Sequence, residues 1–181
     1  MKLVIASDIH GSAAAAHQLA ERIEEFHPDR LVFLGDLLYH GPRNDLPTEY
    51  DTKAVYELIG ALPYPKTAVR GNCDAEVDQW MFDFDILADY QRIEVDGRVF
   101  AMTHGHLYGQ GVLPPGCEDA AVLMNGHTHV KVLERKDGLV LLNPGSTSIP
   151  KDGLASYATY DNGVFALRAL ADGEVVKELA M

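Results

Sequence analysis

Five short segments of the chain carry carboxylate, imidazole and amide side chains at spacings that suit metal ligands. Five of the eight histidines fall in these segments, which favours one shared site over scattered surface histidines. Oxygen and nitrogen donors of this kind suit Mn, Fe, Zn or Mg rather than metals that need thiolates. The segments are Asp8-Ile9-His10, Gly35-Asp36, Gly71-Asn72-Cys73-Asp74, His104-Gly105-His106 and Gly126-His127-Thr128-His129.

Each of these segments follows a short apolar run that predicts a strand. In open α/β sheets the ligand crevice lies at the carboxyl ends of the strands, so we expect the five segments to converge there. A single carboxylate in such a crevice can bridge two metal ions about 3.5–4 Å apart, which is the geometry of two-metal hydrolysis. The predicted strands are Lys2–Ala6, Leu31–Leu34, Lys66–Val69, Val99–Thr103 and Ala121–Met124.

The predicted secondary structure differs between the two halves of the chain, but no linker separates them. The first half alternates strands with helices over Ala13–Phe26 and about Thr52–Leu62, which implies parallel strands. The second half has hairpin signals at Asp96-Gly97, Asp137-Gly138, Asn162-Gly163 and Asp172-Gly173. Further strands are predicted near Tyr90–Val95, Val130–Arg135, Leu139–Leu142, Ser156–Tyr160, Val164–Ala169 and Glu174–Glu178. We therefore expect one domain over residues 1–181.

The charge balance limits the classes of partner. The 181 residues include 15 Lys and Arg against 27 Asp and Glu, a formal net charge of −12. Such a chain repels polyanions and shows no basic stripe, which disfavours extended nucleic acid as a partner. No apolar run approaches the ~18 residues of a membrane helix, and the apolar start meets Asp8 too early for a signal peptide. We predict a cytoplasmic protein with no membrane partner, whose two cysteines cannot form a disulfide framework.

In order and identity, the five segments resemble the calcineurin-like metallophosphoesterases, whose runs are D-x-H, G-D, G-N-H-[DE], H and G-H-x-H. Further segments are closer to the small YfcE-type phosphodiesterase branch of that family, namely Ser7-Asp8-Ile9-His10-Gly11, His40-Gly41-Pro42-Arg43-Asn44 and Asn143-Pro144-Gly145-Ser146. The resemblance implies an α/β fold, a four-layer α/β/β/α sandwich of two mixed sheets. It also implies a metal-dependent phosphodiesterase that acts on a small phosphodiester substrate.

The resemblance also implies a ligand set for two divalent metal ions. Asp8, His10, Asp36 and His129 would hold the first ion. The second would be held by Asp36, Asn72, His104 and His127, so that Asp36 bridges the two. A hydroxide between the ions would attack phosphorus in line with the leaving oxygen. Manganese is the family's usual metal, and Fe, Zn, Ni, Co and Mg remain open because sequence does not separate them.

Three further residues are candidates for a part in the chemistry. Cys73 departs from the wider family, which has a histidine there that assists catalysis, and it either weakens the hydrolysis of monoesters or only fills space. Arg43 either pairs with a substrate phosphate or lies on a solvated loop. Asp74 is expected to orient His104 or another ligand.

Two other functions remain open at this point. One is a phosphomonoesterase or nucleotidase, which would need a group other than a histidine at position 73 to assist the leaving group. The other is a non-catalytic interaction scaffold, the role that the same family fold has in the Vps29 subunit of retromer. The apolar segment Trp80–Phe84 also suggests a homodimer or a higher homo-oligomer.

Overall fold

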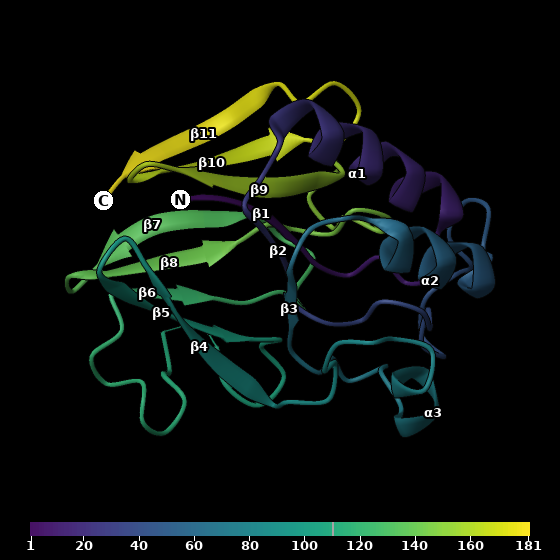
Figure 1. Cartoon of the computed structure of the whole chain (residues 1–181), viewed down its shortest axis with the longest axis horizontal. Coiled ribbons are helices and arrows are strands. Elements are labelled where there is room, and N and C mark those ends of the chain that lie inside the picture. The colour runs from purple at the N-terminus through teal and green to yellow at the C-terminus, as the bar shows by residue number, and fades with distance from the viewer. Residues whose placement is uncertain (110) are drawn as a thin grey trace.

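Two mixed β-sheets stacked face to face form the body of the molecule (Figure 1). The computed structural model describes residues 1–109 and 111–181. The six-stranded sheet has the order β11 (Val175–Ala180), β10 (Val164–Ala169), β9 (Ser156–Asp161), β1 (Lys2–Ala6), β2 (Arg30–Phe33) and β3 (Lys66–Ala68). The five-stranded sheet has the order β4 (Tyr90–Val95), β5 (Arg98–Thr103), β6 (Val122–Met124), β8 (Leu139–Asn143) and β7 (Val132–Lys136).

Each sheet contains a parallel half, and this determines where loops can meet. Strands β1, β2 and β3 run parallel, as do β5, β6 and β8, while the other pairs are antiparallel. The carboxyl ends within each parallel half therefore lie at one edge of its sheet. Three of the four predicted hairpin turns have the expected geometry, because Asp96, Asp137 and Asn162 adopt positive φ immediately before a glycine that does the same. At Asp172-Gly173 only the glycine has positive φ.

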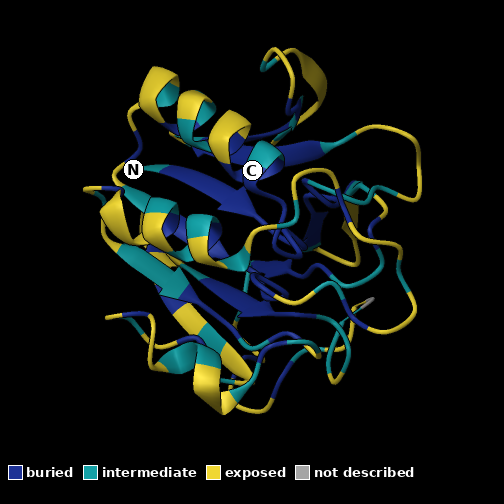
Figure 2. Ribbon diagram, turned by 90° about the vertical axis from the view of Figure 1, so that its right-hand side faces the viewer, coloured by how far each residue is buried: buried dark blue, intermediate teal, exposed yellow. Residues whose placement is uncertain are grey.

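Two helices cover the outer face of the six-stranded sheet, on the side shown in Figure 2. Helix α1 (Ala13–Phe26) begins at Ser12, whose hydroxyl accepts a hydrogen bond from the Ala15 backbone N–H at 3.2 Å. Helix α2 (Thr52–Ala61) begins in the same way at Asp51, which accepts from Ala54. These caps satisfy N–H groups that have no partner inside the helix. A short helix, α3 (Glu76–Gln79), was not predicted from the sequence.

Alternation along the strands divides the apolar residues between separate layers of the core. In β1, Leu3 and Ile5 face the second sheet, while Val4 and Ala6 face the helices. The largest rings between the sheets belong to Phe100, Tyr160 and Phe165. On the outer face of the five-stranded sheet, a loop that includes Cys117 packs against Ala101, Leu123 and Leu141.

Element boundaries shift by one or two residues from the predicted ones. Strand β2 begins at Arg30 rather than Leu31, β7 spans Val132–Lys136 rather than Val130–Arg135, and β11 spans Val175–Ala180 rather than Glu174–Glu178. Among the described residues, no helix is both long and apolar enough to span a bilayer.

Candidate metal centre

The five polar segments meet where β1, β2, β3, β5 and β6 end, as the sequence predicts. Backbone hydrogen bonds join the segments directly. The His10 N–H donates to the Asp36 carbonyl at 2.9 Å, and the Gly126 N–H donates to the His104 carbonyl at 2.8 Å. The second of these bonds links the loops after β5 and β6, so ligands that are far apart in the sequence are held by one backbone network.

Five of the seven predicted ligands adopt a left-handed backbone conformation. Their φ values are 56° at Asp8, 50° at His10, 55° at Asp36, 67° at His127 and 58° at His129. This conformation costs an L-residue on the order of 1 kcal/mol or more, and it persists only where the surrounding structure enforces it. Such concentrated strain is typical of a functional site.

The first group of converging atoms comes from Asp8, His10 and His129. Asp8 Oδ1 lies 3.1 Å from His129 Nε2 and 3.6 Å from His10 Nε2. The two Nε2 atoms are 3.2 Å apart. All three side chains are buried, and their ligand atoms lie close enough together to coordinate one ion.

The second group is built around Asp36, His104 and Asn72. Asp36 Oδ2 lies 3.4 Å from His104 Nε2, and that nitrogen lies 3.2 Å from Asn72 Oδ1. The same Asp36 oxygen is 3.7 Å from His10 Nε2 in the first group. Asp36 therefore stands between the two groups.

Backbone carbonyls orient the three buried imidazoles. Because a carbonyl can only accept, the Nδ1 atom of each ring carries a hydrogen, so Nε2 is the atom that faces the centre and can offer its lone pair to an ion when the ring is neutral. Sequence reasoning missed these partners, because a carbonyl is present at every residue and carries no signal. The pairs are His10 with Tyr39 O at 2.8 Å, His104 with Leu34 O at 2.7 Å, and His129 with Ile149 O at 2.8 Å.

The chemistry of this donor set fits a bound cation. Asp8 Oδ1 is buried without a well-placed hydrogen-bond donor, and the Nε2 atoms of His10 and His129 face it and each other. Burial lowers the pKa of His104, but its hydrogen bond with Asp36 and the charge of Asp8 outweigh burial and raise that pKa to about 9. Burial raises the pKa of Asp8, yet His10 and His129 outweigh it and hold the pKa well below its usual range. Carboxylates of this kind need a neighbouring positive charge, which divalent ions would supply.

His127 is placed differently from the other predicted ligands. Its backbone N–H donates to Asp8 Oδ2 at 3.0 Å, and its ring lies edge-on to His104 with the centroids 5.0 Å apart. The ring is half-buried and lines the cavity at the centre, outside the tight groups formed by the other ligands. Its assignment to a metal therefore remains a prediction.

The three further candidates lie at the centre in distinct ways. Cys73 Sγ is within 4.8 Å of the ligand atoms of His10 and Asp36. Burial raises the pKa of this thiol to about 12, and the Asp36 charge adds to the shift. Arg43 lines the same cavity, of about 620 Å³, together with Lys151. Lys151 is a cation that the sequence did not single out.

Asp74 supports the backbone rather than an imidazole. Its carboxylate accepts from the backbone N–H groups of Asp36 at 2.9 Å, Leu37 at 2.9 Å and Gly71 at 2.7 Å. Burial raises its pKa to about 6, with the Asp36 charge acting in the same direction and the three N–H groups opposing it. Of the two expected partners, His104 is not the one that Asp74 contacts, because His104 Nδ1 faces Leu34 O. Asp74 contacts the other kind, a second predicted ligand, through the backbone N–H of Asp36.

The loop after β8 supports the centre in a way that the sequence did not reveal. The hydroxyls of Ser146 and Ser148 donate to the carbonyl of Asp8 at 2.7 and 3.0 Å. Asn143 Nδ2 donates to the Gly126 carbonyl at 2.8 Å. The segment Asn143-Pro144-Gly145-Ser146 is thus more than a strand-ending turn, because it holds the strained backbone of a predicted ligand.

A glycine permits the close approach of the loops after β1 and β6 at the centre. A Cβ atom at Gly126 would overlap Ser7 Oγ and the Asp8 carboxylate. Ser7 Oγ donates to Asp8 Oδ2 at 2.6 Å, so the loop after β6 lies directly against a ligand and its partner. Position 126 therefore has no room for any side chain.

Comparison with known proteins shows the family of this chain. A model of the calcineurin-like phosphoesterase superfamily domain matches residues 1–163. The chain belongs to this family. It is 43% identical to the phosphodiesterase YfcE of Escherichia coli (strain K12) over 182 residues, which cover 100% of this chain and 98% of YfcE. The structure of YfcE superposes with a TM-score of 0.93 and covers 99% of both chains.

More distant matches include another phosphodiesterase in sequence and a solved structure of similar fold. The phosphodiesterase MJ0936 of Methanocaldococcus jannaschii is 27% identical over 167 residues, which cover 85% of this chain and 92% of MJ0936. The Zn-complexed Vps29 of Entamoeba histolytica superposes with a TM-score of 0.66 at 18% identity and covers 99% of both chains. Likeness at that identity concerns the fold alone.

Proposed function

We propose that this chain is a metal-dependent phosphodiesterase with two divalent metal ions. The observation that carries the proposal is the pair of ligand groups joined through Asp36, which converge with imidazole nitrogens and carboxylate oxygens facing one another and no well-placed hydrogen-bond donor at Asp8 Oδ1. Its 43% identity to a phosphodiesterase over the full chain supports the same reaction.

The side chains have separate tasks in this proposal. Asp8, His10 and His129 hold one ion, Asn72, His104 and His127 hold the other, and Asp36 serves both. When bound, the ions supply Lewis acidity toward a phosphoryl oxygen and lower the pKa of a coordinated water. Manganese is the metal that we expect, and the donor set also suits Fe, Zn, Ni, Co and Mg.

The residues around the ligands orient the substrate. Arg43 and Lys151 bring two positive charges to the rim of the same cavity, where they can pair with the non-bridging oxygens of an anionic phosphodiester. Asp74 keeps Asp36 in position through the backbone. Cys73 contributes a neutral thiol beside the ligands.

The neutral thiol favours diesters over monoesters. A phosphomonoester dianion carries one more negative charge than a diester and needs more positive charge or proton donation near the leaving oxygen. With a pKa of about 12, Cys73 supplies neither a cation nor a ready proton at neutral pH. A diester with a good leaving group depends less on such help, so diester hydrolysis is the activity that this centre supports best.

Hydrolysis of bis(4-nitrophenyl) phosphate tests the proposal. Protein that has been stripped of metal and reloaded separately with Mn, Co, Ni, Zn, Fe or Mg should release 4-nitrophenolate with at least one of them. The matched control is Asp8→Asn, which keeps the side-chain shape and removes the buried charge. No turnover with any metal, in protein shown by elemental analysis to hold two ions, would overturn the proposal and leave the scaffold function of the same fold.

A further inference from the structure

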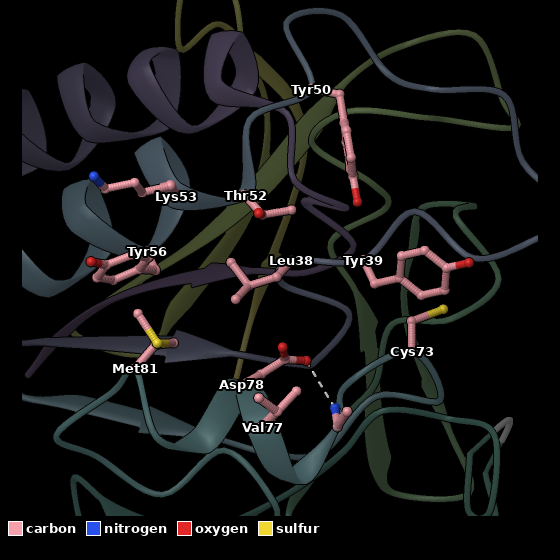
Figure 3. A pocket seen from close by; sticks show the side chains of 11 residues that line it. Leu38, Tyr39, Tyr50, Thr52, Lys53, Tyr56, Cys73, Val77, Asp78 and Met81 are labelled. Atoms are coloured by element: carbon pink, nitrogen blue, oxygen red, sulfur yellow. Dashed lines mark hydrogen bonds between the residues drawn. The ribbon is translucent and has the colours of Figure 1, made fainter.

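A second cavity adjoins the candidate metal centre. It has a volume of about 580 Å³, and its walls include Leu38, Tyr39, Tyr50, Tyr56, Val77 and Met81 (Figure 3). We call it the tyrosine pocket. Cys73 lines both this pocket and the cavity of the metal centre, so the two spaces meet at its side chain.

The composition of the tyrosine pocket is that of a site for a flat organic group. Three tyrosine rings and the side chains of Leu38 and Met81 provide apolar and aromatic surface, and the polar groups besides the tyrosine hydroxyls come from Thr52, Lys53 and Asp78. Pockets of a few hundred Å³ with this balance bind small organic molecules, and aromatic rings favour aromatic partners through stacking or edge contacts. The pocket also carries no cluster of cations that would favour a second phosphate.

The aromatic walls are linked to the metal centre through the backbone and through ring contacts. The Tyr39 carbonyl accepts from His10 Nδ1, so the residue that orients a predicted ligand also lines the pocket. The His40 ring lies edge-on between those of Tyr39 and Tyr50, at centroid distances of 4.8 and 5.1 Å. This row of rings sets the position of two pocket walls relative to the ligands before any substrate binds.

We propose that the tyrosine pocket binds the planar aromatic group of one ester of the phosphodiester substrate while the phosphate lies at the metal centre. This inference rests on the proposed function and specifies its substrate class as a diester with at least one aromatic substituent. Figure 3 shows Tyr39 and Cys73 at one end of the view, with Tyr56 and Met81 at the other. A group that passes Cys73 from the metal centre therefore enters along the tyrosine rings.

Binding of a matched ligand series tests the proposal without requiring turnover. Dimethyl, methyl phenyl and diphenyl phosphate carry the same charge and differ only in the number of rings. Calorimetric titration of metal-loaded protein should give a Kd for methyl phenyl phosphate at least about tenfold below that for dimethyl phosphate, the gain expected from one aromatic contact and ring burial. The second ring of diphenyl phosphate should add little, because one pocket takes one ring.

Substitutions in the pocket test whether its residues cause the gain in affinity for the aromatic ligand. Val77→Ala and Met81→Ala remove pocket side chains that are 56% and 45% exposed, so the fold should survive, and circular dichroism checks it. Each should raise the Kd of methyl phenyl phosphate several-fold and leave that of dimethyl phosphate unchanged. Tyr39→Phe keeps the ring and should bind like the parent protein. Tyr90→Ala removes a tyrosine that is also exposed but lies outside the pocket, and it should change neither Kd.

Three outcomes would overturn the proposal. Equal affinity for dimethyl and methyl phenyl phosphate would show that the pocket takes no ring. Equal losses for both ligands in the variants would show that these residues only shape the metal centre. If the variants keep the same ratio of the two Kd values but disrupt a dimer of the parent protein, the pocket binds a second copy of the chain instead of a ring. Absence of turnover with bis(4-nitrophenyl) phosphate contradicts the proposed function but leaves the ring preference measurable.

Discussion

The Asp36 carboxylate stands between the two ligand groups, with Oδ2 at 3.7 Å from His10 Nε2 and 3.4 Å from His104 Nε2. We expect Asp36→Asn to bind zero or one ion per chain, because it removes a negative charge that both ions would share. At this range the charge contributes several kcal/mol even at an effective dielectric constant of about 20, and each ~1.4 kcal/mol changes affinity tenfold. Metal stoichiometry and far-UV circular dichroism should be measured on one sample. Two tightly held ions in the folded variant would show that Asp36 is not the bridge.

The Cys73 side chain gives a second prediction at the scale of single residues. We expect Cys73→His to raise kcat/KM for 4-nitrophenyl phosphate relative to bis(4-nitrophenyl) phosphate by about 100-fold, the lower end of the gain from a general acid catalyst. The reason is that an imidazole beside the ligands supplies the charge or proton that the thiol lacks. Steady-state kinetics with both substrates measures the ratio, and Cys73→Ser is the control without a cation. An unchanged ratio would mean that position 73 only fills space.

Residue types and their spacing in the sequence predicted which side chains meet at the centre, but they did not predict which groups hold those side chains in place. Asp8, His10, Asp36 and His104 were predicted from their position after apolar strands, and their atoms converge. The supports were missed for identifiable reasons. Tyr39, Leu34 and Ile149 act through carbonyls, whereas Ser146 and Ser148 act on a backbone atom of Asp8. An interaction with a backbone atom does not require a particular residue type, so the sequence contains no signal for it.

At the scale of elements, the loop after β6 depends on the absence of a side chain at position 126. We expect Gly126→Ala to lower the free energy of unfolding by about 2 kcal/mol or more and to weaken metal binding, because its Cβ would overlap Ser7 Oγ and the Asp8 carboxylate. Gly60→Ala is the matched control. Gly60 lies in α2, where an added Cβ would meet no atom within 4 Å, so alanine there should stabilise by about 0.5 kcal/mol. Urea denaturation measures both, and equal effects would contradict the prediction.

The loops after β6 and β8 are joined by an ion pair that predicts a dependence on pH. Lys131 Nζ lies 2.5 Å from Asp152 Oδ1, and its backbone N–H donates to Oδ2 at 2.9 Å. Burial raises the pKa of Asp152, but these bonds outweigh it and leave the pKa below the usual 3.8. A carboxylate with a lowered pKa stabilises the fold above pH 3.8, and this contribution is lost as the pH falls through the folded-state pKa.

We therefore expect Asp152→Asn to lower the free energy of unfolding by up to about 1 kcal/mol at pH 6, with a deficit that narrows below pH 4. Urea titrations of both proteins between pH 3 and pH 7 measure the difference. A deficit that stays constant across that range would mean that packing, and not charge, accounts for it.

The elements themselves were predictable where local signals were strong. Helix α1 was predicted over its full length, Ala13–Phe26, and its local signals agree, because Ser12 caps its start and Ala16, Leu19 and Ile23 form a buried stripe. Helix α3 was missed because four residues make barely one turn, too short for an apolar period. The segment Trp80–Phe84 suggests one apolar patch in the sequence, yet Phe82 is buried while Trp80 is 83% exposed. Hydrophobic periodicity cannot predict which apolar side chains are buried in a segment without regular secondary structure.

At the scale of the whole molecule, the layer between the sheets contains residues of both halves of the chain. Phe100 is fully buried there, with its ring 5.3 Å from Tyr160 and 5.5 Å from Phe165. We expect Phe100→Ala to lower the free energy of unfolding by about 3–5 kcal/mol and to keep a single cooperative transition, because the shared layer couples the sheets. Scanning calorimetry of metal-free protein measures both quantities. Two separate transitions would contradict our proposal that residues 1–181 form one domain.

The left-handed backbone at the centre has a consequence for how this chain can change over evolutionary time. A descendant that no longer needed metals could lose every ligand side chain, but its loops would still have to turn at positions 8, 10, 36, 127 and 129. Branched side chains are poorly tolerated in that conformation, whereas glycine, asparagine and aspartate accept it. Substitutions that accumulate at these positions should therefore be mostly to a few small or polar residues. The left-handed backbone at these positions would persist in a descendant that had lost metal binding and acquired another function.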